Sequence, residues 1–144
     1  MMSNRVNIKN ILILAGTMEI LVGLLHFAMP YFVYQIEGFQ MLNNIESNFI
    51  SLLIYAVGIL LVSFGFLSLL FAFHLKSMQN ILFYYLIIKA SLWTARVVLE
   101  LVYPVELNMF YIEKFTVIVL PGLFFEALLF IFAIILFKHK GLTQ

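Results

Sequence analysis

Residues 49–75 read FISLLIYAVGILLVSFGFLSLLFAFHL, a run without Asp, Glu, Lys or Arg. The run is longer than the roughly 20 residues that a helix needs to cross the hydrocarbon core of a bilayer. Three more apolar segments lie on either side of it, at residues 11–34, 81–103 and 115–137. A soluble helix would carry a wide polar face, which these segments lack. The sequence therefore predicts four transmembrane helices.

The composition leads to the same prediction. The 144 residues are 65% hydrophobic and 10% charged, whereas soluble domains are about 45–50% apolar and about 25% charged. A chain this short cannot bury so much apolar surface inside itself. The net charge of +1 is too weak for nucleic-acid binding, which needs a clustered basic footprint. Cysteine is absent, which excludes disulfides, thiolate metal sites and cysteine nucleophiles.

The connections between the apolar segments are short, so neighbouring helices are expected to run antiparallel. The expected fold is all-α: an integral membrane four-helix bundle of up-down topology, forming a single membrane domain over residues 1–144. Residues 35–48 form the longest connection outside the membrane, and we expect a solvated loop in preference to a segment folded over the outer mouth.

The charges beside the helices predict the orientation. One side carries Arg5, Lys9, Lys76, Lys138 and Lys140, and the other carries Lys114 with Glu37, Glu46, Glu106 and Glu113. An excess of Lys and Arg marks the cytoplasmic side. We therefore expect a multi-pass protein of the plasma (inner) membrane with both termini in the cytoplasm.

Six ionisable residues remain inside the predicted spans: Glu19, His26, Lys89, Arg96, Glu100 and Glu126. A charge at the centre of a membrane helix costs about 2.5–3.5 kcal/mol on insertion scales, so these groups should face one another or water. Helical spacing places Lys89, Trp93, Arg96 and Glu100 within an arc of about 60°.

The first span carries its own polar and small-residue face. Gly16, Glu19, Gly23, His26 and Pro30 lie within about 80° of one another. The second span presents small and polar residues suited to close helix packing, namely Ser51, Tyr55, Gly58 and Gly65.

The rise of about 1.5 Å per residue also predicts the depth of each group. Glu19 should lie level with Lys89, and Glu126 near the midplane. His26 should lie level with Arg96, and Glu100 one turn further out, where an i,i+4 pair with Arg96 can form. Three Glu against Lys89 and Arg96 leave one surplus acid, which favours a group that handles protons.

Two interpretations of these residues stay open. Buried ion pairs can fix helix register without binding anything, and intramembrane ionisable groups also mark binding sites, proton relays and catalytic pockets. A metal site is disfavoured because Glu19 and His26 lie about 10.5 Å apart along one helix. Haem is disfavoured because His26 and His74 lie at different depths. Trp93 can stack on a ligand or interact with a cation.

Residues 23–30 read GLLHFAMP, following an apolar run. This stretch resembles the opening of the DoxX-like proteins, small four-helix membrane proteins with a Gly, a polar residue and a Pro near the end of the first helix. The resemblance implies a link to quinone-associated redox chemistry or to membrane stress complexes. His26 stands where a basic residue is expected, and no catalytic residue carries over from the family.

The leading hypothesis is a membrane protein whose buried ionisable pocket binds a small or lipophilic ligand, with a quinone as the candidate cofactor. The candidate ligand-binding or proton-relay residues are Glu19, His26, Lys89, Trp93, Arg96, Glu100 and Glu126. The alternatives are a proton-coupled small transporter, an intramembrane lipid-modifying enzyme and a structural subunit of a membrane complex. Catalytic residues are not assigned. The expected partners are the bilayer, a lipophilic small molecule, and further copies of the chain or a membrane-complex partner.

Overall fold

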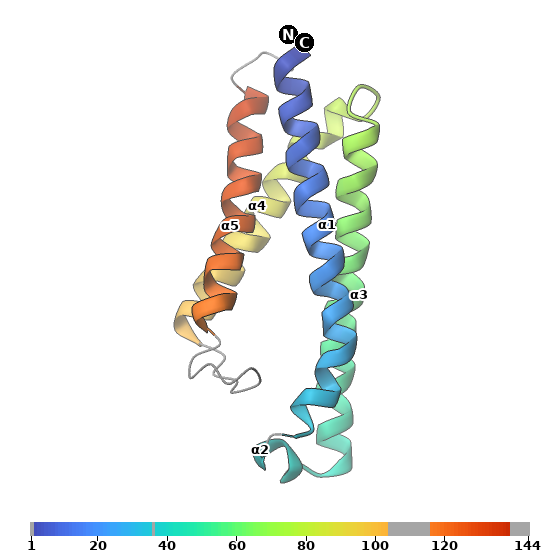
Figure 1. The fold of residues 1–144 in the computed structure, drawn as a ribbon, viewed down its shortest axis with the longest axis vertical. Helices are drawn as coiled ribbons and strands as arrows, with labels where there is room; N and C mark the ends of the chain where they lie inside the picture. Colours follow the sequence, from blue (N-terminus) through green and yellow to red (C-terminus); the bar gives the residue numbers. More distant parts are fainter. Residues whose placement is uncertain (1, 36, 104–115, 139–144) are drawn as a thin grey trace. The chain divides into compact units, whose positions relative to one another are not determined.

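Four long helices and one short helix make up the described part of the chain. The structure is a computed structural model and describes residues 2–35, 37–103 and 116–138. In chain order the helices are α1 (Met2–Val33), α2 (Glu37–Gln40), α3 (Asn44–Phe73), α4 (Gln79–Val102) and α5 (Thr116–Lys138) (Figure 1). The described residues contain no strand, so the all-α prediction is confirmed. All four long helices are long and apolar enough to cross a membrane.

The chain divides into two compact units. One comprises Met1–Leu12 with Phe71–Gln144, and the other comprises Ile13–Leu70. The prediction that residues 1–144 form one membrane domain stays a prediction. Among the predicted orientation charges, four lie outside the described residues: Glu106, Glu113, Lys114 and Lys140.

Two helices begin earlier than the apolar segments do. The first helix starts at Met2 rather than near residue 11. Its buried face extends to residues that precede the apolar segment, because Ile8, Leu12 and Ala15 recur at helical spacing and are all buried. The third helix starts at Asn44, close behind a reciprocal cap. Asn43 Oδ1 accepts hydrogen bonds from the N–H groups of Ile45 and Glu46, and Glu46 Oε2 accepts one from the N–H of Asn43.

The connection between α1 and α3 differs from the expected solvated loop. It contains α2, and the Phe39 side chain on this short helix is buried. The Phe39 ring meets the Tyr34 ring edge-on at a centroid distance of 4.9 Å, and the Tyr34 hydroxyl shares a hydrogen bond of 3.3 Å with Ser51 Oγ. The aromatic contact explains why this loop folds back on its own unit.

In the unit Ile13–Leu70, α1 and α3 run antiparallel and touch through glycines (Figure 1). A Cβ on Gly65 would lie 2.6 Å from the Gly16 carbonyl oxygen, and a Cβ on Gly23 would lie 2.8 Å from the Gly58 carbonyl oxygen. Both contacts are too close for any side chain. The two glycines on each helix are spaced alike, so both contacts fall on one seam, and the predicted small-residue face of α3 is confirmed as a helix contact.

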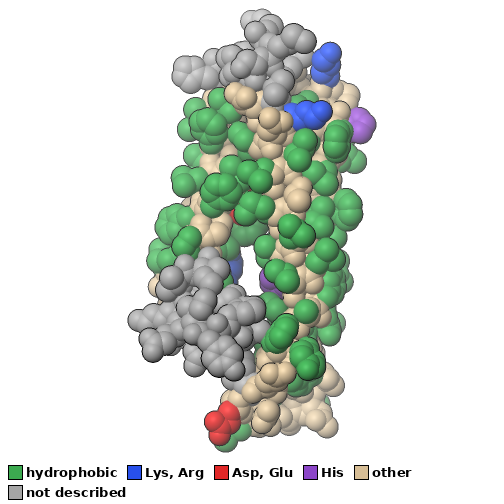
Figure 2. Space-filling view, viewed as in Figure 1, with side chains coloured by type: hydrophobic (Ala, Val, Ile, Leu, Met, Phe, Trp, Pro, Cys, Tyr) green, Lys and Arg blue, Asp and Glu red, His purple; other side chains and the backbone are tan. Residues whose placement is uncertain are grey.

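The distribution of side chains is inverted relative to a soluble protein. Large apolar side chains are exposed on every long helix, among them Leu25, Leu52, Ile88 and Leu128, and Figure 2 shows hydrophobic side chains covering the visible face of the helices. In contrast, Glu19, Lys89, Glu100 and Glu126 are all buried. Soluble proteins rarely bury Glu or Lys side chains fully, and they rarely expose large contiguous apolar patches.

Replacing Gly65 by Ala tests the glycine seam. We expect Gly65→Ala to lower the free energy of unfolding by about 1–3 kcal/mol, because the added methyl group must push α1 and α3 apart. Thermal and chemical denaturation in detergent, followed by circular dichroism, measure the change. Gly122→Ala is the matched control, because a Cβ at Gly122 meets no atom within 4 Å; it should leave stability unchanged or raise it by about 0.5–1 kcal/mol. Equal losses in the two variants would contradict the seam.

Candidate functional site

One face of α4 carries four of the candidate residues. Lys89, Trp93 and Glu100 are buried on this face. The side chain of Arg96 lies on the same face by helical spacing and is 41% exposed. The four residues therefore lie on one side of α4, as their spacing predicts. Their role in binding or catalysis stays a prediction.

Lys89 lies between two aromatic rings. Its Nζ atom is 5.7 Å from the centroid of the Trp93 ring on α4 and 5.2 Å from the centroid of the Phe130 ring on α5. The Lys89 residue is only 2% exposed. Ring faces carry partial negative charge and attract a cation within about 6 Å, an effect that grows when water is excluded. The two rings therefore offset part of the cost of burying an ammonium group.

Phe130 is a residue of this cluster that the sequence analysis did not identify. It follows Glu126 by one helical turn, and both are buried on the same face of α5 together with Ala133 and Phe137. The i,i+4 spacing from Glu126 was the available signal. Unless the register of α5 against α4 is known, the sequence does not distinguish Phe130 from the other aromatic residues of this apolar helix.

Two side-chain contacts fix that register. Lys89 contacts Phe130, and the Phe83 ring stacks on the Phe137 ring at a centroid distance of 5.6 Å. Increasing residue numbers along α4 therefore pair with decreasing residue numbers along α5, as in two antiparallel helices. The same register puts Glu126 level with Trp93, one turn from Lys89. The Glu126 residue is 4% exposed, so a buried carboxyl, a buried ammonium and two rings occupy neighbouring turns of the α4–α5 pair.

Arg96 and Glu100 form the predicted i,i+4 ion pair. Arg96 Nη2 lies 2.6 Å from Glu100 Oε2, and the Glu100 side chain is fully buried. The pair joins the guanidinium of a partly exposed side chain to the carboxylate of a fully buried one. Within α4 and α5, the two basic residues Lys89 and Arg96 equal in number the two acidic residues Glu100 and Glu126. The polar face of α4 is accessible at the level of Arg96.

Glu19 and His26 belong to the other unit. Glu19 is fully buried on α1 between Gly16 and Gly23, and Ser68 Oγ on α3 donates a hydrogen bond of 3.3 Å to Glu19 Oε2. Ser68 was missed in the sequence, although it follows Gly65 by three residues on the small-residue face of α3. Residues 13–70 contain no Lys or Arg. The predicted pairing of Glu19 with Lys89 at equal depth joins the two units and stays a prediction.

His26 is held by its own helix. Its Nδ1 lies 2.8 Å from the Val22 carbonyl oxygen, and since a carbonyl only accepts, Nδ1 carries a proton in this bond. The bond to Val22 involves Nδ1, and Nε2 is the second polar atom of the His26 ring. The predicted equal depth of His26 and Arg96 also joins the two units and stays a prediction.

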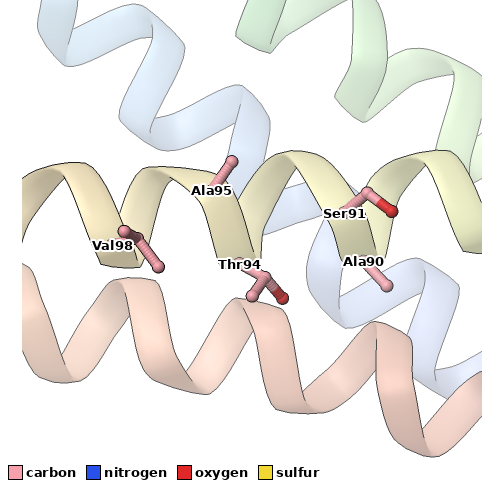
Figure 3. Close-up of a pocket in the computed structure, with 5 residues that line it drawn as sticks. All are labelled: Ala90, Ser91, Thr94, Ala95 and Val98. Carbon is pink, nitrogen blue, oxygen red and sulfur yellow. The ribbon is translucent and has the colours of Figure 1, made fainter.

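A hollow of about 440 Å³ runs along α4, away from the Lys89 cluster. Figure 3 shows the small side chains that line it, all from this helix: Ala90, Ser91, Thr94, Ala95 and Val98. By helical spacing most of these residues lie on the side of α4 opposite Lys89 and Glu100. None of the candidate residues lines the hollow, so it is separate from the cluster.

In the parts of the chain that the structure describes, no group of three or more His, Asp or Glu side chains could hold a metal ion. Comparisons with protein-family models, with curated proteins and with solved structures found no match for the chain. The resemblance of residues 23–30 to the DoxX-like proteins stays a prediction.

A double-mutant cycle tests the Arg96–Glu100 pair. We expect Arg96→Met to lower the free energy of unfolding by about 1–3 kcal/mol, because it removes the positive charge beside a buried carboxylate. Arg96→Met combined with Glu100→Leu should recover most of that loss, since an apolar replacement of both partners is often nearly neutral. Chemical denaturation in detergent measures all variants. A double variant that loses the sum of the two single losses would show that the ion pair contributes no coupling energy.

Proposed function

We propose that the protein is a multi-pass membrane protein whose four long helices all cross the bilayer as an up-down bundle. The support is the inverted distribution of side chains, with large apolar groups outside and four ionisable groups inside. Within hydrocarbon a helix satisfies its own backbone hydrogen bonds, so helices of this length suit the proposed environment. The positive charges at the N-terminus, at Lys76 and at the C-terminus support a cytoplasmic position for both termini. The proposed location is the plasma (inner) membrane.

Reporter fusions and membrane extraction test this part of the proposal. A fluorescent protein fused to the C-terminus should be bright, and alkaline phosphatase fused there should be inactive, because both report a cytoplasmic terminus. The chain should stay in the membrane fraction after carbonate washing. A fusion within residues 35–48 should give the opposite pair of results and serves as the control. Release by carbonate would contradict insertion, and active phosphatase at the C-terminus would contradict the orientation.

We further propose that the α4–α5 pair binds a small lipophilic ligand with an anionic or carbonyl group. The observation that carries this proposal is the buried Lys89 ammonium, held between the Trp93 and Phe130 rings with the Glu126 carboxyl one turn away. Ionisable groups buried within membrane-spanning helices commonly mark ligand sites and proton pathways.

Each residue has a distinct role in the proposed site. Lys89 donates hydrogen bonds to a ligand oxygen, and such bonds from a charged donor are stronger than neutral ones. Trp93 and Phe130 pack against a planar ligand ring. Glu126 exchanges a proton with the bound molecule. Arg96, partly exposed on the same face, attracts an anionic group on its way to Lys89.

A quinone fits this set of groups. Its planar ring can stack on aromatic side chains, and its two carbonyl oxygens accept hydrogen bonds and take up protons on reduction. A lipid-soluble molecule would also reach an intramembrane site by diffusing within the bilayer. The resemblance of residues 23–30 to the DoxX-like proteins favours the same ligand class.

Trp93 gives a direct readout, because it is the only tryptophan in the chain. We expect decylubiquinone to quench its fluorescence saturably in detergent or nanodiscs. Lys89→Met should weaken binding about 10- to 100-fold, the equivalent of a hydrogen bond from a charged group. Lys76→Met, on an exposed turn, is the matched control and should bind as the parent protein does.

Three outcomes would separate this proposal from its alternatives. Non-saturable quenching that is equal in the parent and Lys89→Met proteins would leave Lys89 as part of a structural cluster. Proton flux into protein-containing liposomes, abolished by Glu126→Gln, would favour a proton-coupled transporter instead. A stoichiometric protein partner in native mass spectrometry, with no bound small molecule, would favour a subunit of a membrane complex.

A further inference from the structure

Four helix ends meet at one end of the unit that comprises Met1–Leu12 and Phe71–Gln144. These are the beginning of α1, the end of α3, the beginning of α4 and the end of α5 (Figure 1). Three described lysines lie there, one on each of three segments: Lys9 on α1, Lys76 in the turn between α3 and α4, and Lys138 at the end of α5. We call these three residues the basic rim.

Aromatic rings of neighbouring helices hold two of the three side chains. Lys9 Nζ lies 5.4 Å from the centroid of the Phe73 ring on α3, and Lys138 Nζ lies 5.8 Å from the centroid of the Phe83 ring on α4. The Phe83 ring is itself stacked on Phe137. The ammonium groups of Lys9 and Lys138 therefore lie close to aromatic rings of neighbouring helices, which attract a cation.

Acidic residues are absent from the sequence around the basic rim. Residues 1–12, 71–99 and 127–144 contain no Asp or Glu, and they add Arg5 and Lys140 to the three described lysines. No Asp or Glu side chain in these stretches competes for the ammonium groups. The Tyr84 side chain near the beginning of α4 is 67% exposed, as expected for a ring in the headgroup layer.

We propose that the basic rim binds the phosphate groups of anionic phospholipids in the leaflet that contacts this end of the unit. The inference rests on the proposed membrane insertion and is independent of the ligand site at Lys89. Clusters of Lys and Arg beside transmembrane helices attract anionic headgroups, each near-surface charge strengthening binding about fivefold. The lysines lie on three separate segments near the same end of this unit, an arrangement that suits headgroups arrayed around helices.

Native mass spectrometry in mixed micelles tests the proposal. With equal amounts of phosphatidylglycerol and phosphatidylcholine, we expect the protein to retain phosphatidylglycerol preferentially. Lys9→Gln, Lys76→Gln and Lys138→Gln should each weaken that preference about fivefold, and added sodium chloride should weaken it further. Lys114→Gln removes the same charge from the connection between α4 and α5 and should leave the preference unchanged.

Several results would overturn the inference. Equal retention of the two lipids would do so, and so would equal losses in Lys114→Gln and the three rim variants. Competition by millimolar inorganic phosphate would show a site for free anions instead of lipid headgroups. Circular dichroism and the thermal midpoint in phosphatidylcholine alone check that each variant is folded. Release of the parent protein from membranes by carbonate washing would contradict insertion itself, a result distinct from equal lipid retention.

Discussion

The desolvation of charge is the constraint on which the other features depend. An ammonium or carboxylate group loses several kcal/mol of hydration when it leaves water, and the loss is offset only by well-placed partners. Lys89 lies between two rings, Glu100 pairs with Arg96, and Glu19 accepts a hydrogen bond from Ser68. The contact of Lys89 with Phe130 and that of Ser68 with Glu19 each join two helices. These two charged groups therefore restrict how each helix pair can slide or rotate.

The two helix pairs meet that constraint in different ways. In α1 and α3 the glycines bring the backbones together, so that a short serine reaches a glutamate across the seam. In α4 and α5 large rings fill the interface, and the lysine is stabilised by their faces. In the proposed bilayer apolar side chains would gain little by leaving lipid, so close backbone contact and polar contacts would hold the helices together. The two pairs offer these two kinds of contact within one short chain.

The sequence predicted the helices well and the contacts unevenly. Long apolar runs determine helix number, and periodicity alone placed Lys89, Arg96 and Glu100 on one face, because all three belong to a single helix. Phe130 and Ser68 were missed because their importance depends on how one helix is registered against another. The early start of α3 was also missed, although Asn43 and Glu46 carry the local signature of a capping box. Local geometry can be deduced from spacing, whereas partners across an interface require the fold.

The uneven distribution of cations has a consequence for biosynthesis. All eight Lys and Arg residues lie in Met1–Leu12 and Phe71–Gln144, and residues 13–70 contain none. If the chain inserts into a bilayer as proposed, residues 13–70 bring no Lys or Arg to orient themselves. The charge signals for this stretch then come from its borders, with Arg5 and Lys9 synthesised before it and Lys76 directly after it.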